Sequence, residues 1–302
     1  MVRKVSCPIF GTTHIELDSI ISSWSNQMLT QQDIRKSLNK FKVIEDTVDI
    51  ARSRVAKNFF QTNDLELKLG ATLPKYWHWF FCWETAEDQL LGLDGHIKPG
   101  NNIIPDTGFP RRMWGGSEIN FFEPLTIGME ITRIITLESI NYKRGNSGEF
   151  CIIELKNELK HHEQTLLIER QNLIYLPIRK AFDKVASQPH NNLSKNFLAR
   201  RYTENQLFKY SALTMNSHRI HYDLDYCKNV EHYPSLVVHG PLLAQNLIDA
   251  ANQKLEGELR FFKYRALNPV FVSDEFTINF SDNGEFWIMD KSGILSMSAV
   301  AS

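Results

Sequence analysis

Residues 210–223 bring several chemically active side chains together in one short stretch. They include the carboxamide of Asn216, the imidazoles of His218 and His221, and the guanidinium of Arg219. An imidazole, with an unperturbed pKa of about 6.5, both takes and gives a proton near neutral pH. We predict that His221 is a general acid–base and that Asn216 acts with it, because such clustering is more typical of an active site than of a structural histidine. We expect His218 and Arg219 to contact the substrate.

A second signal is the pair His239 and Gly240, which opens a predicted helix over residues 240–255. Pro241 suits the first turn of that helix. A backbone N–H at a helix N-terminus, with no side chain in the way, can donate to a carbonyl oxygen that gains charge during a reaction. We predict that Gly240 binds such an oxygen, and that His239 either orients a partner or fills an interface.

The spacing of His218 and His221 is also compatible with metal binding. Zinc needs a third and usually a fourth ligand. The nearby side chains that offer one are Asp223, Asp225, Cys227 and His239. No dedicated metal-ligand spacing is present, so we predict no metal and no other cofactor. A Gly-x-Ser-x-Gly hydrolase motif and nucleotide-binding glycine loops are absent from the sequence.

Composition bounds the classes of function. A length of 302 residues favours two domains, and a hydrophobic content of 42% is enough to build their cores. A net charge of −1 argues against a general nucleic-acid binder. No apolar run approaches the roughly 20 residues of a membrane span. The four cysteines are far apart, which predicts buried or free thiols in a reducing compartment. Arg3 and Lys4 resemble, faintly, the start of an organelle transit peptide.

The first half reads as helices followed by strands. Residues 15–60 are expected to be helical, with Thr30 and Asp33 as a capping pair, and residues 73–91 to form a longer helix with an aromatic core face. A long loop over 92–116 contains Arg111 and Arg112, which either grip a phosphate, shape a subunit contact or lie in solvent. Strands are predicted over residues 118–122, 129–140, 149–155 and 165–176.

The second half repeats this order. After a linker-like stretch at 188–192 and the helix over 240–255, strands are predicted over residues 260–267, 270–280, 285–290 and 294–301. Residues 124–132 and 269–277 share the pattern proline, apolar, any, apolar, small, any, Glu, apolar, Thr. This match predicts two copies of one α+β unit. The expected units are 1–60, an N-terminal helical extension; 61–180, a degenerate domain; 181–200, a linker; and 201–302, the catalytic domain.

Residues 210–223, with His239 and Gly240, resemble the type 2 hydratase motif of MaoC-like, R-specific enoyl-thioester hydratases and dehydratases. Within that family the chain is most similar to the hydroxyacyl-thioester dehydratases type 2 of fungal mitochondria, and mesaconyl-CoA-type hydratases carry a similar His-Arg-Ile-His segment. The resemblance implies a double hot-dog fold, in which an antiparallel sheet wraps around a long helix twice. It also implies reversible removal of water from a 3-hydroxyacyl thioester, without a cofactor, and gives His221 the position of the catalytic histidine.

One position departs from the family pattern. Asn216 stands where most members have the catalytic aspartate, and His218 where they have asparagine. A carboxamide can orient a water but cannot take its proton. We therefore expect His221 alone to shuttle the proton, while Asn216 holds the hydroxyl.

The resemblance leaves the carrier and the compartment open. Acyl carrier protein and acyl-CoA are the alternative carriers, and basic side chains in and near the second half could receive either: Arg200, Arg201, Lys209, Arg219, Arg260, Lys263 and Arg265. A mitochondrial location is expected, with the cytoplasm as the alternative, and a homodimer is one candidate assembly. The rival functions are an acyl-CoA hydratase of the mesaconyl-CoA or enoyl-CoA type, a thioesterase, and a non-enzymatic acyl-thioester-binding protein. We disfavour the thioesterase because no obvious carboxylate lies near Leu247.

Overall fold

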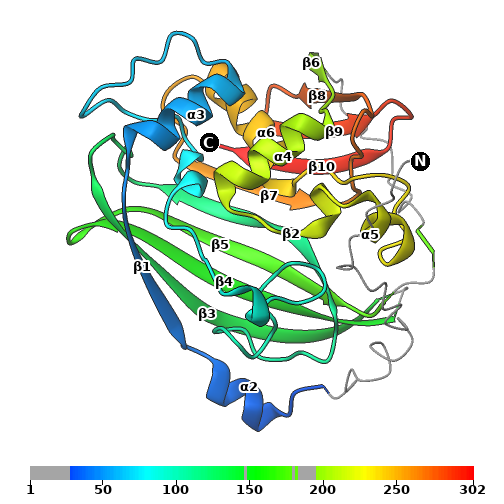
Figure 1. Cartoon of the computed structure of the whole chain (residues 1–302). Helices are drawn as coiled ribbons and strands as arrows, with labels where there is room; N and C mark the ends of the chain where they lie inside the picture. Colours follow the sequence, from blue (N-terminus) through cyan, green and yellow to red (C-terminus); the bar gives the residue numbers. More distant parts are fainter. Residues whose placement is uncertain (1–27, 146–147, 179–180, 183–194) are drawn as a thin grey trace, which may run out of the picture.

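The computed structural model describes residues 28–145, 148–178, 181–182 and 195–302. The strands of this part of the chain form one ten-stranded sheet in the order β1-β3-β4-β5-β2-β7-β10-β9-β8-β6, and every neighbouring pair is antiparallel (Figure 1). The predicted transit-peptide start and the linker-like residues 188–192 lie outside the described residues.

The first half of the chain supplies one side of the sheet. Its elements are α2 (Gln31–Ser37), β1 (Phe41–Thr47), α3 (Ile50–Phe60), the short 3-10 helices η1 (Trp77–Phe80) and η2 (Asp88–Leu90), β2 (Arg111–Phe121), β3 (Glu130–Gly145), β4 (Gly148–His161) and β5 (Gln164–Leu176).

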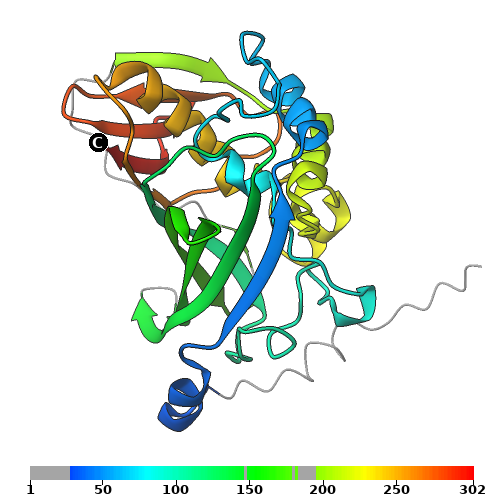
Figure 2. The same cartoon turned by 90° about the vertical axis from the view of Figure 1, so that its left-hand side faces the viewer.

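The second half supplies the other side. Its elements are β6 (Lys195–Arg200), α4 (Glu204–Thr214), the 3-10 helix η3 (Arg219–His221), α5 (Leu224–Asn229), α6 (Gly240–Lys254), β7 (Phe261–Ala266), β8 (Phe276–Phe280), β9 (Glu285–Asp290) and β10 (Leu295–Ala301). In both views α3 of the first half lies beside α4 of the second (Figures 1 and 2).

The two halves of the sheet have the same internal order. Reading inward, β1-β3-β4-β5-β2 matches β6-β8-β9-β10-β7, and the two inner strands β2 and β7 pair with each other. Across this seam Lys263 Nζ lies 3.0 Å from a carboxylate oxygen of Glu118. This repeated arrangement is the predicted double hot-dog fold, with the two sheets joined into one.

The nine-residue pattern predicted from the sequence marks the same turn in both halves. Thr126 forms an isolated bridge with Thr72, and Phe271 forms the equivalent bridge with Val237. Each turn then passes through a left-handed residue, Gly128 with φ 96° and Ser273 with φ 66°. The segment that enters the centre of each half is therefore anchored in the same way.

The predicted helix of the second half is present as α6. Leu243, Leu247 and Ala251 are buried on its inner face, at 3% exposed or less, and α6 packs on β7, β8, β9 and β10. Apolar residues spaced three to four apart place one continuous face against the sheet. This helix fixes the position of Gly240 relative to the sheet.

The predicted helix over residues 73–91 is wrong. Only η1 and η2 are helical there, and the chain passes through left-handed conformations at Tyr76 (φ 77°) and Cys82 (φ 53°). Aromatic side chains have lower helix propensity than aliphatic ones, and these rings pack in several directions. The predicted core face is confirmed for Tyr76 and Phe80, each 1% exposed, whereas Leu90 of the same predicted face is 36% exposed.

The N-terminal boundaries also need correction. Thr30 and Asp33 form the predicted capping box before α2. Residues 41–47, however, are the strand β1, which pairs with β3 and belongs to the first half of the sheet. Residues 195–200, assigned to a linker, are the strand β6, which pairs with β8. Each half thus begins with an outer strand that the helical and linker predictions missed.

The segment with Arg111 and Arg112 is the start of β2 and not a loop. Arg111 is 8% exposed, and its Nε donates to Glu231 Oε2 at 2.6 Å, so its charge is paired inside the protein. At Gly116, with φ 138°, an added Cβ would lie 2.2 Å from Tyr264 O on β7. The glycine therefore permits close approach of the two halves, and Arg111 is not a phosphate ligand.

Three cysteines lie in the described part of the chain. Cys82, Cys151 and Cys227 are buried and free of disulfides, as predicted for them. Burial raises the pKa of Cys227 to about 12, so its sulfur remains a protonated thiol at neutral pH. None of the helices described in this structure combines the length and the apolar character needed to cross a membrane.

Candidate active site

His221 closes η3 directly after the Asn216–His218 segment and is 6% exposed. Its Nδ1 lies 2.7 Å from Val237 O. Because a carbonyl oxygen only accepts, Nδ1 carries the hydrogen, and Nε2 keeps the free lone pair in the neutral ring. The contact therefore orients the imidazole and leaves Nε2 as the basic atom.

The other predicted segment meets His221 at the start of α6. The ring of His239, which is completely buried, stacks on the ring of His221 at 3.6 Å between centroids and 18° between planes. His239 Nε2 lies 2.8 Å from Ser211 Oγ on α4, which holds the ring in place. Since His239 directly precedes Gly240, the structure brings the His221 imidazole beside the helix N-terminus.

Gly240 begins α6, and the first N–H groups of a helix have no partner within it. An added Cβ at Gly240 would lie 3.2 Å from Cδ1 of Trp114, so this indole covers the helix start. Trp114 comes from β2 of the first half, and its Nε1 donates to the Tyr264 hydroxyl at 2.9 Å. The sequence analysis does not predict Trp114 as a site residue, although it considers the nearby Arg111 and Arg112 as candidates for binding a phosphate.

Asn216 acts first on the local backbone. Its side-chain Oδ1 accepts a hydrogen bond from the backbone N–H of His218 at 3.0 Å. The backbone N–H of Asn216 donates to Ser211 O at 2.8 Å. The carboxamide therefore shapes the turn that leads into η3, and its NH₂ group is the part that remains able to donate.

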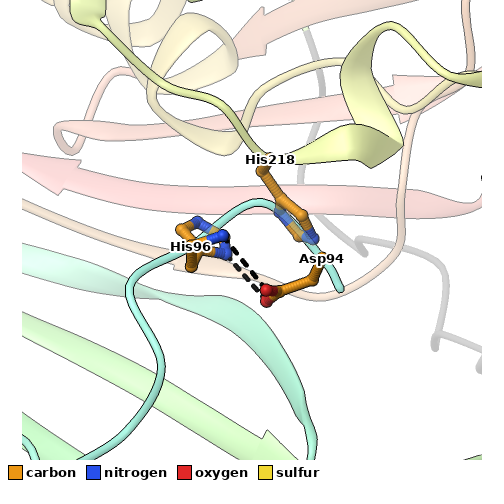
Figure 3. A group of neighbouring side chains, drawn as sticks. All are labelled: Asp94, His96 and His218. Atoms are coloured by element: carbon orange, nitrogen blue, oxygen red, sulfur yellow. Dashed lines mark hydrogen bonds and ion pairs between the residues drawn. The ribbon is translucent and has the colours of Figure 1, made fainter. Parts of the chain in front are cut away.

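His218 lies between two other imidazoles. Its ring centroid is 4.2 Å from that of His96 and 5.5 Å from that of His221. The ring is 6% exposed, and among the described residues its Nε2 has no hydrogen-bond partner. His96 belongs to a loop of the first half, where its Nδ1 donates to Asp94 Oδ2 at 2.9 Å (Figure 3). The sequence analysis did not identify Asp94 and His96 as site residues. The only feature in the sequence that could have indicated them is a carboxylate and an imidazole two positions apart.

Arg219 holds the structure together at this point, in contrast to its predicted contact with substrate. Its Nε and Nη2 donate to Asp223 Oδ2 at 3.0 and 2.6 Å, and its Nη1 donates to Leu93 O at 3.1 Å. The guanidinium also lies 4.6 Å from the ring centroid of Tyr226. Arg219 thus ties η3 and α5 to the loop that carries Asp94.

The site is a low-dielectric environment for imidazoles. Burial lowers the pKa of His221 to about 3, against an opposing contribution from the Val237 hydrogen bond. Burial likewise holds the pKa of His218 and of His239 well below the usual value. For His96, burial and then the nearby Arg112 charge lower the pKa. All four rings are therefore neutral at neutral pH.

The structure does not assemble the metal ligands that the sequence suggested. Asp223 is paired with Arg219, and Cys227 Sγ donates to Ile220 O at 3.1 Å. A different set, Asp94, His96 and His218, has potential ligand atoms within 4.8 Å of one another. Burial opposes ionisation of Asp94, but its contacts with His96 hold the pKa of this carboxyl below the usual value, so its oxygens are already engaged by His96.

The loop that carries Asp94 fits against the catalytic segment at a glycine. An alanine Cβ at Gly95 (φ +89°) would lie 2.0 Å from Ser217 O, whereas Gly100, with φ +90°, has nothing within 4 Å. We predict that Gly95→Ala undocks residues 91–98 at a cost of about 1–3 kcal/mol, because a backbone oxygen cannot move aside. Hydrogen exchange of this loop measures the effect. Gly100→Ala is the matched control, and equal exchange in both variants would contradict the prediction.

Comparisons with known proteins agree with this geometry. The profile of the family described as hydroxyacyl-thioester dehydratase type 2 matches residues 76–272. The chain is 30% identical over 252 residues to mesaconyl-C(4)-CoA hydratase of Chloroflexus aurantiacus, covering 82% of this chain and 89% of that protein. It is 29% identical over 204 residues to the mitochondrial hydroxyacyl-thioester dehydratase type 2 of Saccharomyces cerevisiae, covering 63% of this chain and 71% of that protein.

A solved structure shares the fold. HtdX of Mycobacterium tuberculosis superposes with a TM-score of 0.62 at 12% identity, over 87% of this chain and 99% of that chain. At such low identity the likeness concerns the fold alone. The family profile and the relatives named hydratase and dehydratase carry the assignment, and they confirm the resemblance seen in the sequence. The chain therefore belongs to the hydroxyacyl-thioester dehydratase type 2 family of hydro-lyases.

Proposed function

We propose that the chain is a 3-hydroxyacyl-thioester dehydratase, which reversibly hydrates trans-2-enoyl thioesters. The observation that carries this proposal is the position of His221. Its Nδ1–H is fixed on Val237 O, its ring stacks on His239, and Gly240 follows at the N-terminus of α6. This arrangement supports a site in which the base and the backbone amide of Gly240 act on the same acyl group.

In the hydration direction, His221 Nε2 accepts a proton from water while the water oxygen bonds to C3 of the enoyl group. The electrons of the double bond move toward the thioester carbonyl, whose oxygen gains negative charge. The N–H of Gly240, aided by the helix dipole, stabilises that charge. The imidazolium then returns the proton to C2, so that one molecule of water is added and His221 is regenerated.

The test is an assay with crotonyl-CoA that follows both loss of the enoyl absorbance and release of free thiol. Hydration without thiol release supports the proposal. Thiol release without hydration would instead identify a thioesterase, and the absence of both reactions would leave a binding protein. The sequence-based argument against a thioesterase needs one correction, because Asp249 does lie near Leu247 on α6. It is nine residues after Gly240, or about 13 Å along the helix axis, so it is not part of the same site.

Replacement of Asn216 by aspartate restores the residue that most family members have. Its carboxylate can still accept from the His218 N–H, so we expect the turn to be kept. The negative charge would also favour a proton on a nearby imidazole. The expected result is a kcat/KM equal to or above that of the wild type, measured by crotonyl-CoA hydration. Loss of turnover in a folded variant would show that the carboxamide is needed in another role than orienting the hydroxyl.

The finer assignment is mitochondrial fatty acid synthesis, with acyl carrier protein as the carrier. It is supported by the name of the Saccharomyces cerevisiae relative, whereas the Chloroflexus aurantiacus relative supports the alternative of an acyl-CoA hydratase. Of the basic side chains that could receive a carrier, Lys263 and Arg260 are paired with Glu118 and Glu258. Competition between crotonyl-CoA and the crotonyl carrier protein separates the two carriers.

We also infer a division of labour between the halves. Residues 61–180, with β1 added, would form the degenerate unit, and residues 201–302, with β6 added, the catalytic one. Where the second half has His239 and Gly240 after Val238, the first has Pro74 and Lys75 after Leu73, and it carries no long central helix. Trp114, which covers Gly240, supports a role of the first half in shaping the substrate cavity. Sedimentation would establish whether the chain forms a homodimer.

A further inference from the structure

A loop of the first half is fixed against the catalytic segment of the second. The backbone N–H of Arg219 donates to Asp94 O at 2.9 Å, and Ser217 Oγ donates to Gly95 O at 2.5 Å. These bonds join residues that are more than a hundred positions apart in the sequence. The side chains of Asp94 and His96 are therefore held at a defined place beside His218.

The side chains of Asp94, His96 and His218 lie next to one another (Figure 3). Both oxygens of Asp94 accept from His96, one from the ring at 2.9 Å and one from the backbone at 3.0 Å. The ligand atoms of the three residues lie within 4.8 Å of one another, and His218 Nε2 has no partner in the described part of the protein. His96 and Asp94 bond each other directly, and a separation of up to 4.8 Å from His218 lies within the span of two hydrogen bonds through one water.

We propose that Asp94, oriented by His96, and His218 bind the water molecule that adds to the enoyl thioester, and that Asp94 supplies the carboxylate which the motif lacks at Asn216. This inference rests on the proposed function and identifies its water site. Asp94 lies 122 positions before Asn216 in the sequence, so the carboxylate comes from the other half of the fold.

The chemistry of the cluster suits a neutral water better than a metal ion. A carboxylate has four lone-pair sites, so Asp94 can accept from a water in addition to its two bonds from His96. A water that donates one hydrogen to Asp94 has its second hydrogen for His221 Nε2 and a lone pair for C3. Asp94 takes no proton in this step, because the proton moves from water to His221 and then to C2. Against the effect of burial, the contacts with His96 favour the ionised carboxylate and hold the pKa of Asp94 below its usual value.

The first test is Asp94→Asn, compared with Asp88→Asn. Asp88 is an exposed carboxylate in the same segment of the chain, so it controls for loss of charge on that segment. We expect Asp94→Asn to lower kcat for crotonyl-CoA hydration by about 10–10³-fold with KM nearly unchanged, since an activated water and not substrate binding is lost. Asp88→Asn should retain wild-type kcat. Equal kcat in wild type and Asp94→Asn would overturn the proposal.

A rescue experiment separates this role from a structural one. In the double variant Asp94→Asn, Asn216→Asp, a carboxylate returns at the family position, on the other side of His218. We expect kcat to recover at least about tenfold over Asp94→Asn alone. A variant whose loop has simply undocked would not respond to a charge at position 216, so the absence of recovery counts against a water-binding carboxylate. Loss of wild-type activity after dialysis against a chelator would contradict the proposal, because it would indicate that these residues bind a metal ion and not a water.

A crystal structure that resolves ordered waters gives a readout independent of turnover. The expected result is a water within about 3.2 Å of both His218 Nε2 and an oxygen of Asp94, absent from Asp94→Leu. A dry or closed gap in the wild type would refute the water site even if the protein hydrates crotonyl-CoA. A wild type that contains this water but hydrates no enoyl thioester would instead refute the proposed function.

Discussion

Replacement of His221 by alanine is expected to lower kcat for enoyl-thioester hydration by about 10²–10⁴-fold, the usual contribution of a positioned general acid–base. Two neighbouring groups are poorly placed to substitute for it. His239 stacks on the same ring but has its Nε2 bonded to Ser211, and Asn216 offers a carboxamide that cannot take a proton. Steady-state rates with crotonyl-CoA at several substrate concentrations measure the effect.

Two further variants make the result interpretable. His221→Gln keeps a side-chain donor near Val237 O without a basic nitrogen, so it should lose as much activity as His221→Ala while disturbing the packing less. His162→Asn removes an exposed imidazole on the β4–β5 turn and should leave kcat unchanged. A near-wild-type rate in a correctly folded His221→Ala protein would end the assignment of this residue.

The protein should lose stability steeply as the pH falls below about 6.5. His96, His218, His221 and His239 all have lowered pKa values in the folded state, chiefly through burial. Below the unfolded pKa of about 6.5, the unfolded chain binds protons that the folded one does not, so acid favours unfolding. Each ring contributes up to about 1.4 kcal/mol per pH unit. For His221 the window extends from about 6.5 down to about 3.

Urea unfolding at a series of pH values between neutral and mildly acidic measures this dependence. The free energy of unfolding should be nearly constant above the unfolded pKa and then fall with a slope of several kcal/mol per pH unit. Replacing one ring, for example by His218→Gln, should reduce the slope by up to about 1.4 kcal/mol per pH unit, and His162→Asn should not change it. A flat profile down to pH of about 5 would mean that water reaches these imidazoles.

The local sequence pattern predicted the structure correctly where residues close in the sequence also contact one another in the fold. Alternating and β-branched residues predicted four of the five strands described in each half, and the apolar spacing after Pro241 predicted α6. The nine-residue repeat predicted the duplication because both copies occupy the same anchored turn. The proximity of Asn216, His218 and His221 in the sequence likewise made the catalytic segment visible.

Local pattern failed where tertiary packing outweighs propensity. The aromatic run at residues 73–91 has the spacing of a helix, yet its rings pack in several directions around left-handed turns, and only short 3-10 segments form. Phe41, within the segment 15–60 that was predicted to be helical, lies on the strand β1 because pairing with β3 decides its conformation. Residues 111–116 were predicted as the end of a loop, but they begin β2, which pairs with β5 and, from Gly116 onward, with β7.

The amino-acid sequence alone determined the family and the repeated α+β unit, and it singled out His221 as the candidate catalytic histidine, because each signal lies within a contiguous segment. Only the tertiary structure decided which groups of the first half reach that histidine. Trp114 covers Gly240, and Asp94 and His96 lie beside His218. These contacts depend on how two distant segments dock, through bonds such as that between Ser217 and Gly95, 122 residues apart. No spacing along the chain encodes such a contact, because it arises from the joined sheet that positions both halves.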